Sequence, residues 1–317
     1  MNTKVKPSSK SIHLPTWLHN LIKYLEKGWH YLVVPPLVEK AKRLEHEEKK
    51  KQKSKDEDDD DDFEIDYKRA TSEFFRRLFA EFIGTMLLTA GHGADRLESK
   101  RGLISNESAA FNNGVSLLFL VYSLGGLSGA HFNPIVTMAF TARLVFPWIW
   151  LPFYLLFQFI GALCGGLIIR ALFGGTYAAL GTNSVDTHVT TVASCFKWEI
   201  FLTFCLLFVI LQTATKANII GSQAAIAVGA VAAFDSLLGG YYSTSSMNPF
   251  RTLGPSIINN STDNRHSLWI YIVGPFLGGL LAWVVVSLLQ GYLPKSKNEI
   301  ISAHGEELNN VPDEIDV

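Results

Sequence analysis

The chain of 317 residues is 48% hydrophobic and carries a net charge of −1, but its charges are placed unevenly. Residues 1–72 hold 15 Lys or Arg and 14 Asp or Glu, whereas residues 73–293 hold only 11 and 9. A soluble domain carries about 25% charged residues, so this composition excludes a soluble domain over residues 73–293. The near-neutral net charge indicates no particular class of partner, and we expect no binding of nucleic acid. We therefore predict a cytoplasmic arm over 1–72, a membrane domain over 73–293 and an acidic cytoplasmic tail over 294–317.

The N-terminal arm carries two distinct patterns. Residues 14–33 place Leu and Trp at helical spacing but are too short and too polar to cross a bilayer. Such a helix suits the membrane interface, and covering the cytoplasmic face of the membrane domain or binding a partner are open alternatives. A Lys-rich run over 40–55 and the sequence DEDDDDD over 56–62 follow, and we expect both to be disordered. Ser54 and Ser72 lie in sequences that resemble kinase sites, and we hypothesise that the arm regulates the activity or the trafficking of the membrane domain.

Six segments are long and apolar enough to cross a bilayer, which needs about 20 residues. They are Phe74–Gly91, Ala110–Leu127, Trp148–Leu172, Ser194–Thr215, Ser222–Gly240 and Leu268–Leu289. An even number of spans places both termini on one side of the membrane. Basic residues are slightly more numerous on that side, which predicts cytoplasmic termini. Glycosylation sequons at Asn106, Asn259 and Asn260 fall on the other side, and the sequence does not distinguish the plasma membrane from an internal one.

Two further apolar stretches, Pro134–Phe146 and Pro249–Ile258, are too short to span, and each follows directly on an Asn. Proline suits the first turn of a helix, where its missing N–H is not needed. Each Asn-Pro therefore predicts the start of a helix of half length. A helix that starts at membrane depth presents unpaired N–H groups and a partial positive charge there.

The two halves of the membrane domain repeat each other. AEFIGT at 80–85 corresponds to WEIFLT at 198–203, and the offsets are 118 for Glu81 to Glu199, 115 for Asn133 to Asn248 and 117 for Phe159 to Phe276. Because each half has three spans, the second half must be inverted in the membrane. Inverted repeats with broken helices that meet at the midplane are a known way to build a permeation site.

The residues around the two Asn-Pro pairs resemble signatures of the major intrinsic protein family, the aquaporins and aquaglyceroporins. SGAHFNPIVTMA is similar to SGAHxNPAVT, and SMNPFRTLGP is similar to MNPARxxGP; the likeness covers roughly residues 73–293. The resemblance implies an all-α membrane protein with six transmembrane helices and two half-helices. It also implies a homotetramer with one pore per subunit and passive conduction of water. We expect neither a cofactor nor a metal.

The resemblance also implies roles for single residues. Asn133 and Asn248 would donate hydrogen bonds to a water at the pore centre, and Arg251 would form the constriction together with Asn113, Ser236 and Ser245. The acceptors along the pore would be the backbone carbonyls of Gly129, Ala130, His131 and residues 243–246. Asn113 shares a helix face with three leucines that we expect to form an apolar wall, namely Leu117, Leu120 and Leu124.

The sequence departs from the family pattern at the pore centre and at the constriction. The family's Ala after Asn-Pro is Ile135 in the first copy and Phe250 in the second, and these larger side chains either repack the centre or narrow it. Asn113, Ser236 and Ser245 are small and polar, which predicts a wider filter than that of a strict water channel. Urea, ammonia, glycerol and hydrogen peroxide are then candidate solutes in addition to water.

Ionisable residues inside the spans need an explanation because they are costly there. We interpret Glu81 and Glu199 as structural acceptors for the half-helix loops, with a proton relay as the alternative. His131 is either a pH sensor or a neutral donor beside the pore, and Asp235 is expected at a helix end. His92 and His188 are expected in loops without partners, and no nucleophile-and-base set indicates an enzyme. A broken-helix secondary transporter and a non-conducting structural paralogue remain alternatives to the channel.

Overall fold

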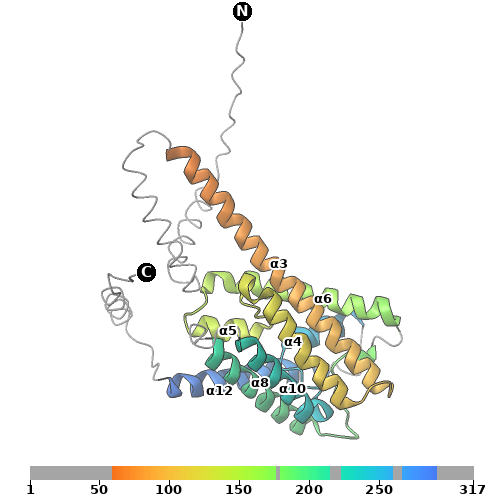
Figure 1. The fold of residues 1–317 in the computed structure, drawn as a ribbon. Helices are drawn as coiled ribbons and strands as arrows, with labels where there is room; N and C mark the ends of the chain where they lie inside the picture. Colours follow the sequence, from red (N-terminus) through yellow and green to blue (C-terminus); the bar gives the residue numbers. More distant parts are fainter. Residues whose placement is uncertain (1–58, 176–178, 215–222, 260–265, 291–317) are drawn as a thin grey trace, which may run out of the picture.

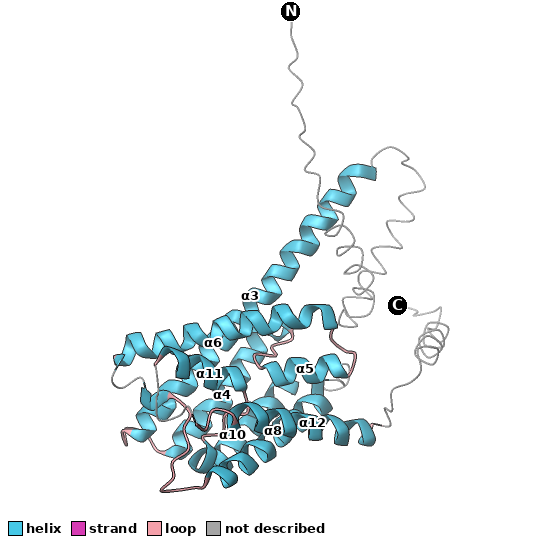
Figure 2. Cartoon of the chain, turned by 180° about the vertical axis from the view of Figure 1, so that it is seen from behind, coloured by secondary structure: helices cyan, strands magenta, loops and turns pink. Residues whose placement is uncertain are grey.

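The computed structural model describes residues 59–175, 179–214, 223–259 and 266–290, and in these ranges the regular elements are all helices (Figures 1 and 2). The six long helices are α3 (Asp59–Lys100), α4 (Asn106–Ser128), α6 (Leu151–Phe173), α8 (Val192–Ala214), α10 (Ala224–Ser243) and α12 (Ile270–Leu289). Two short helices, α5 (Pro134–Ala142) and α11 (Pro249–Ile258), begin at the two Asn-Pro sites as predicted. The predicted interfacial helix, the Lys-rich run, Ser54, Asn260 and the acidic tail lie outside the described residues.

Within the described ranges, five helices are long and apolar enough to cross a membrane, and they correspond to the last five predicted spans. They are α4, α6 with the 3₁₀ turn Trp148–Trp150 before it, α8, α10 and α12. The first predicted span, Phe74–Gly91, lies inside α3. Helix α3 is more polar because Arg76, Arg77 and Glu81 lie along that stretch. The observed bundle of six long and two half-length helices therefore confirms the predicted fold.

Helix α3 begins earlier than the sequence suggested. Residues 59–62, expected to be disordered, already form its first turn. Figure 1 shows this end of α3 projecting beyond the bundle. The predicted boundary at residue 72 falls within the helix, and the division into three parts stays a prediction.

The repeat is visible in how the helices pack. Helix α3 lies against α6 and α4, and in the second half α8 lies in the same way against α12 and α10. Glycines allow the close approach: a Cβ on Gly161 of α6 would lie 2.5 Å from the carbonyl oxygen of Phe82, and one on Gly278 of α12 would clash with the carbonyl oxygen of Ile200. In lipid, where apolar side chains gain little by leaving the solvent, such close packing is a main source of helix association.

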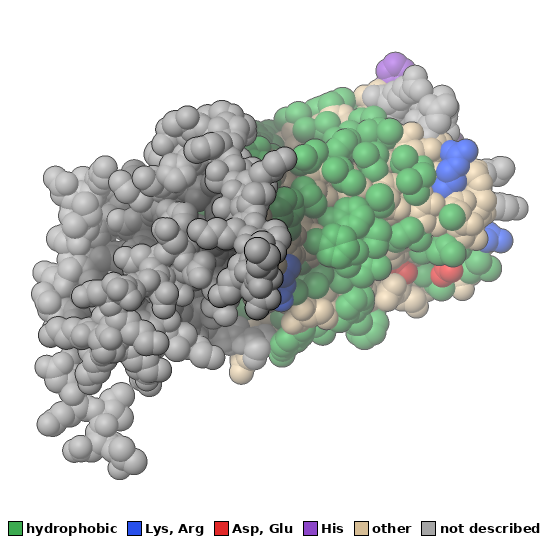
Figure 3. Space-filling model, turned by 90° about the horizontal axis from the view of Figure 1, so that it is seen from above, with side chains coloured by type: hydrophobic (Ala, Val, Ile, Leu, Met, Phe, Trp, Pro, Cys, Tyr) green, Lys and Arg blue, Asp and Glu red, His purple; other side chains and the backbone are tan. Residues whose placement is uncertain are grey.

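The outer surface of the bundle is apolar. Large hydrophobic side chains such as Phe79 (59% exposed) and Leu237 (57%) point outward, and Figure 3 shows hydrophobic side chains covering much of the described part of that face, with blue Lys and Arg near its end. A soluble monomer rarely exposes an apolar area of this extent. The surface suits contact with lipid.

Candidate functional site

Each half-helix is capped by the Asn that precedes its proline. Asn133 Oδ1 accepts from the backbone N–H of Ile135 at 3.0 Å, and Asn248 Oδ1 accepts from those of Phe250 at 3.1 Å and Arg251 at 3.3 Å. Asn is among the best N-cap residues because its side-chain oxygen satisfies N–H groups that the helix itself leaves unpaired. The local sequence therefore explains why both helices begin where they do.

The two caps also join the half-helices to each other. Asn133 Nδ2 donates to the carbonyl oxygen of Met247 at 2.8 Å, and Asn248 Nδ2 donates to that of Phe132 at 2.8 Å. Each asparagine thus bonds to the loop that leads into the opposite half-helix. A primary amide has two N–H donors, so one on each Asn is left for a molecule between the loops. Hydrogen bonds from these remaining N–H groups to a central water stay a prediction.

The loops before the half-helices share an unusual backbone. Ala130 and Phe132 have φ of 51° and 49°, and the residues 115 positions further on, Ser245 and Met247, have 44° and 52°. Left-handed conformations cost a non-glycine residue on the order of 1 kcal/mol or more and persist only where the surroundings hold them. The carbonyls predicted to accept hydrogen bonds from permeating solutes belong to these two loops.

Glu81 holds the first loop. Its Oε1 accepts from Ser128 Oγ at 2.6 Å and from the backbone N–H of His131 at 3.0 Å, and its Oε2 accepts from that of Phe132 at 2.8 Å and from Gln158 Nε2 at 2.8 Å. The carboxylate is fully buried, and a buried charge is tolerated only when it is well hydrogen-bonded.

Glu199 holds the second loop in the same way. Its Oε1 accepts from Ser243 Oγ at 2.8 Å and from the backbone N–H of Ser246 at 2.9 Å, and its Oε2 accepts from that of Met247 at 2.9 Å. Both oxygens of each carboxylate are therefore engaged in positioning a loop. This arrangement favours the structural interpretation of the two glutamates over the proton relay.

Ile135 and Phe250, the residues that depart from the family pattern, pack against neighbouring helices. Ile135 is buried in the largest apolar cluster and occupies the space that a side chain on Gly279 of α12 would need. The ring of Phe250 lies 5.3 Å from that of Phe159 in α6. Neither residue lines the two pockets described below. These contacts favour repacking of the centre over narrowing.

Truncation of Ile135 tests this assignment. Ile135→Ala should leave a cavity over Gly279 and lower the stability by about 2–4 kcal/mol, as is typical for loss of a buried Ile. We expect no increase in water permeability, because Ile135 lines neither the narrow pocket nor the wide cavity described below. Thermal unfolding in detergent and swelling of proteoliposomes measure the two effects. Faster swelling at unchanged stability would show instead that Ile135 narrows the pore.

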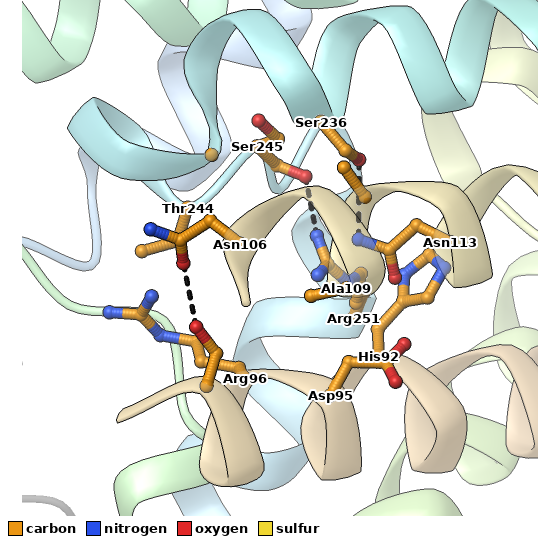
Figure 4. A pocket seen from close by; sticks show the side chains of 13 residues that line it. His92, Asp95, Arg96, Asn106, Ala109, Asn113, Ser236, Thr244, Ser245 and Arg251 are labelled. Atoms are coloured by element: carbon orange, nitrogen blue, oxygen red, sulfur yellow. Dashed lines mark hydrogen bonds between the residues drawn. The ribbon is translucent and has the colours of Figure 1, made fainter. Parts of the chain in front are cut away.

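A narrow polar pocket of about 50 Å³ contains all four residues predicted for the constriction, Asn113, Ser236, Ser245 and Arg251 (Figure 4). Asn113 Nδ2 donates to Ser236 Oγ at 3.2 Å. Arg251 is 6% exposed, and its Nη1 donates to the carbonyl oxygens of Ser245 and Ser246. The structure thus brings together residues from α4, α10, α11 and the second loop, and their role as a filter stays a prediction.

A wider cavity of about 330 Å³ lies on the other side of the loops. Residues 106–113 of α4 line the narrow pocket and residues 121–126 line the wide cavity, so the two lie toward opposite ends of the helix. Gly129 and Ala130 of the first loop line the wide cavity. Its apolar wall comes from Val121, Val136, Phe140, Ile210 and Val228. Leu117, Leu120 and Leu124 line neither of the two pockets and pack with Leu88 and Phe132 in a core cluster, and the apolar wall expected of them stays a prediction.

Several side chains of the narrow pocket were missed by the sequence analysis. His92 and Asp95 both line it from α3. The expectation that His92 lies in a loop without a partner is wrong, because α3 continues to Lys100 and His92 Nε2 lies 3.4 Å from Ser116 Oγ. His92 and Asp95 are three residues apart and so lie on one face of a helix, which was the available signal. That signal can be used only if the helix is known to extend past Gly91.

The remaining predicted positions are more scattered. The His131 ring stacks on Phe140 with ring centroids 4.9 Å apart, and His131 lines neither of the two pockets. The role of its backbone carbonyl as a pore acceptor stays a prediction. Asp235 was expected at a helix end but is fully buried inside α10. Ser72 and Asn106 are exposed. Asn259 is only 8% exposed, which disfavours its use as a glycosylation site in this conformation.

Inverted half-helices joined through their caps, with a pocket on one side and a cavity on the other, define a membrane bundle of the channel type. The profile described as "Major intrinsic protein" matches residues 68–286, and the chain belongs to this family of integral membrane proteins. The similar curated proteins include "Aquaporin NIP1-1" of Zea mays, 39% identical over 214 residues that cover 66% of this chain and 73% of that protein. Another is "Aquaporin NIP2-1" of Zea mays, 34% identical over 242 residues, 73% of this chain and 79% of that protein. Among solved structures, the aquaglyceroporin from Plasmodium falciparum superposes with a TM-score of 0.59 at 24% identity over 66% of this chain and 94% of that one, which supports the fold.

Proposed function

We propose that the protein is a passive channel for water and small neutral solutes. The observation that carries the proposal is the reciprocal bonding of Asn133 and Asn248, which sets two half-helix N-termini between a narrow polar pocket and a wider cavity. The names of the similar proteins, aquaporins and an aquaglyceroporin, support the same class of function.

The proposed mechanism follows from the chemistry of the path. A permeating molecule loses part of its water shell in the narrow pocket and regains hydrogen bonds from Arg251 and from the carbonyls of the loops. The buried Arg251 and the two helix N-termini repel cations, which lets neutral molecules pass while excluding cations. The small Asn113, Ser236 and Ser245 leave room for solutes such as urea, ammonia, glycerol or hydrogen peroxide. A homotetramer with cytoplasmic termini, and regulation by the N-terminal arm, are further parts of the proposal.

Stopped-flow swelling of proteoliposomes that contain the full chain tests the function. We expect water permeability well above that of empty liposomes, together with measurable entry of urea and glycerol. Water flux without any solute flux would contradict the wide filter, and flux that saturates or needs an ion gradient would favour a transporter. A chain without residues 1–58, which retains the whole of α3, tests the arm: unchanged flux and unchanged surface level would remove its proposed regulatory role.

A further inference from the structure

The two half-helices carry a threonine at equivalent positions. Thr137 lies in α5 and Thr252 in α11, 115 residues apart, which is the offset between Asn133 and Asn248. Both threonines are fully buried, so each hydroxyl group needs partners within the protein. In the first half, Thr137 Oγ1 donates to the carbonyl oxygen of Asn133 at 3.1 Å and accepts from Gln158 Nε2 at 2.9 Å. An amide group from α6 thus binds the first threonine.

The repeat cannot supply the same amide in the second half. Gln158 corresponds to Pro275 in α12, at the offset of 117 residues already found between α6 and α12. Proline has neither an N–H nor a side-chain donor. Thr252 Oγ1 instead accepts from Asn183 Nδ2 at 2.6 Å. Asn183 is 3% exposed and lies in the segment between α6 and α8, which joins the two halves of the repeat.

The directions of the hydrogen bonds beyond Thr252 follow from the number of hydrogens. A hydroxyl group has one hydrogen to donate, and that of Ser246 goes to the carbonyl oxygen of Asn248 at 3.0 Å. Ser246 Oγ must therefore accept from Thr252 Oγ1, to which it is also hydrogen-bonded. Asn183 thus begins an ordered series of donors that ends at the N-cap residue of α11. Every member of the series is at most 4% exposed.

The series holds residues of the second loop and of the narrow pocket. The carbonyl oxygen of Ser246 accepts from Arg251 Nη1 at 3.2 Å, and the backbone N–H of Ser246 binds Glu199. Thr252 directly follows Arg251 in α11. A shift of Thr252 or Ser246 would therefore displace Arg251 together with the loop before α11.

The segment that carries Asn183 is itself held against α3. Arg96 Nε donates to the carbonyl oxygen of Thr182 at 3.0 Å, and Arg96 Nη2 donates to Ser184 Oγ at 3.4 Å. Three consecutive residues of the segment therefore join α3 of the first half to α11 of the second. Asn183 is presented to Thr252 from a backbone that is fixed on both sides.

We propose that Asn183 is a positioning residue for permeation, which takes in the second half the place that Gln158 has in the first. It fixes the second loop and Arg251 by donating to Thr252. The inference rests on the proposed channel function and adds a role for the segment between the two halves, which the repeat itself does not contain.

A double-mutant cycle tests whether Asn183 acts through Thr252. Asn183→Ala removes the donor, and Thr252→Val replaces the hydroxyl group by a methyl group of similar size. We expect each substitution to lower the water permeability per channel by about tenfold, as for loss of a buried hydrogen bond. Because both break the same contact, the double variant should conduct as well as Thr252→Val alone. Independent effects would instead multiply to about a hundredfold.

A rescue variant tests the equivalence with Gln158. Asn183→Ala combined with Pro275→Gln leaves space beside Thr252 and offers it an amide from α12. We expect this pair to conduct water within about twofold of the wild type, because the buried donor is restored. A general loosening of the segment would not be repaired by a change in α12. The cycle decides the question if the rescue variant does not reach the membrane, and Asn183→Asp, which keeps the size of the side chain but presents an acceptor, replaces Asn183→Ala if that variant does not.

Ser184→Ala is the matched control, because it removes a bond of the same segment to α3 and none to α11; it should conduct water like the wild type. All variants are compared in vesicles that contain equal amounts of protein. Wild-type protein that conducts no water would overturn the channel function itself. Normal conduction by the variants at Asn183, independent effects in the cycle, or a reconstituted rescue variant that conducts no better than Asn183→Ala would overturn the role of Asn183 while the channel function stands.

Discussion

Replacing Glu199 with leucine is expected to abolish water conduction and to lower stability more than a change at the lipid-facing surface. The substitution removes the acceptor for the N–H groups of Ser246 and Met247 and for the hydroxyl of Ser243. Each buried donor left unpaired costs about 1–3 kcal/mol, and the loop they hold contains residues in left-handed conformations that need support. Without these bonds Met247 should lose its place opposite Asn133.

Conservative and distant substitutions serve as controls for this prediction. Glu199→Gln keeps one oxygen but presents an amide nitrogen to backbone donors, so an intermediate loss is expected. Glu81→Leu should match Glu199→Leu, because Glu81 holds the first loop through the corresponding N–H groups. Leu237→Ala, at an exposed position, should conduct water like the wild type. Thermal unfolding in detergent and vesicle swelling give both readouts, and normal conduction by Glu199→Leu would contradict the structural role of the carboxylate.

The parts of the fold that the sequence predicted well are those with a local signal. Asn-Pro marks the start of a half-helix because both the cap and the first turn are decided by two adjacent residues. The paired glutamates were interpretable because a carboxylate inside a span needs a partner and the repeat supplies an equivalent one. In the first case the residues that interact are adjacent in the sequence, and in the second the internal repeat provides an equivalent residue in the other half of the chain.

What the sequence could not predict depends on contacts between distant segments. The place of Ile135 is decided by Gly279, more than a hundred residues away, and no local pattern links the two. The polar side chains that line the narrow pocket from α3 and α4 meet Arg251 only in the folded bundle. His92 was misplaced because the end of a helix that leaves the membrane is not marked by hydropathy.

Replacing Gly254 with alanine should lower both stability and water permeability, although it adds a single methyl group. Gly254 lies in the MNPFRTLGP stretch, and a Cβ there would lie 2.5 Å from the carbonyl carbon and oxygen of Ala162 in α6. Because these are backbone atoms, they cannot turn aside, and α11 must move. Overpacking of this kind costs about 1–3 kcal/mol.

The functional loss follows from what α11 carries. Its cap, Asn248, bonds to the first loop at Phe132, and its first turn carries Arg251, so a displaced α11 disturbs both the joined caps and the narrow pocket. Gly91→Ala is the matched control, because a Cβ at this position of α3 would meet nothing within 4 Å. Alanine is better in a helix than glycine by about 1 kcal/mol, so this variant should unfold at the same or a higher temperature and conduct water normally. Equal behaviour of the two variants in unfolding and swelling measurements would mean that the contact between α11 and α6 does not fix the position of Asn248.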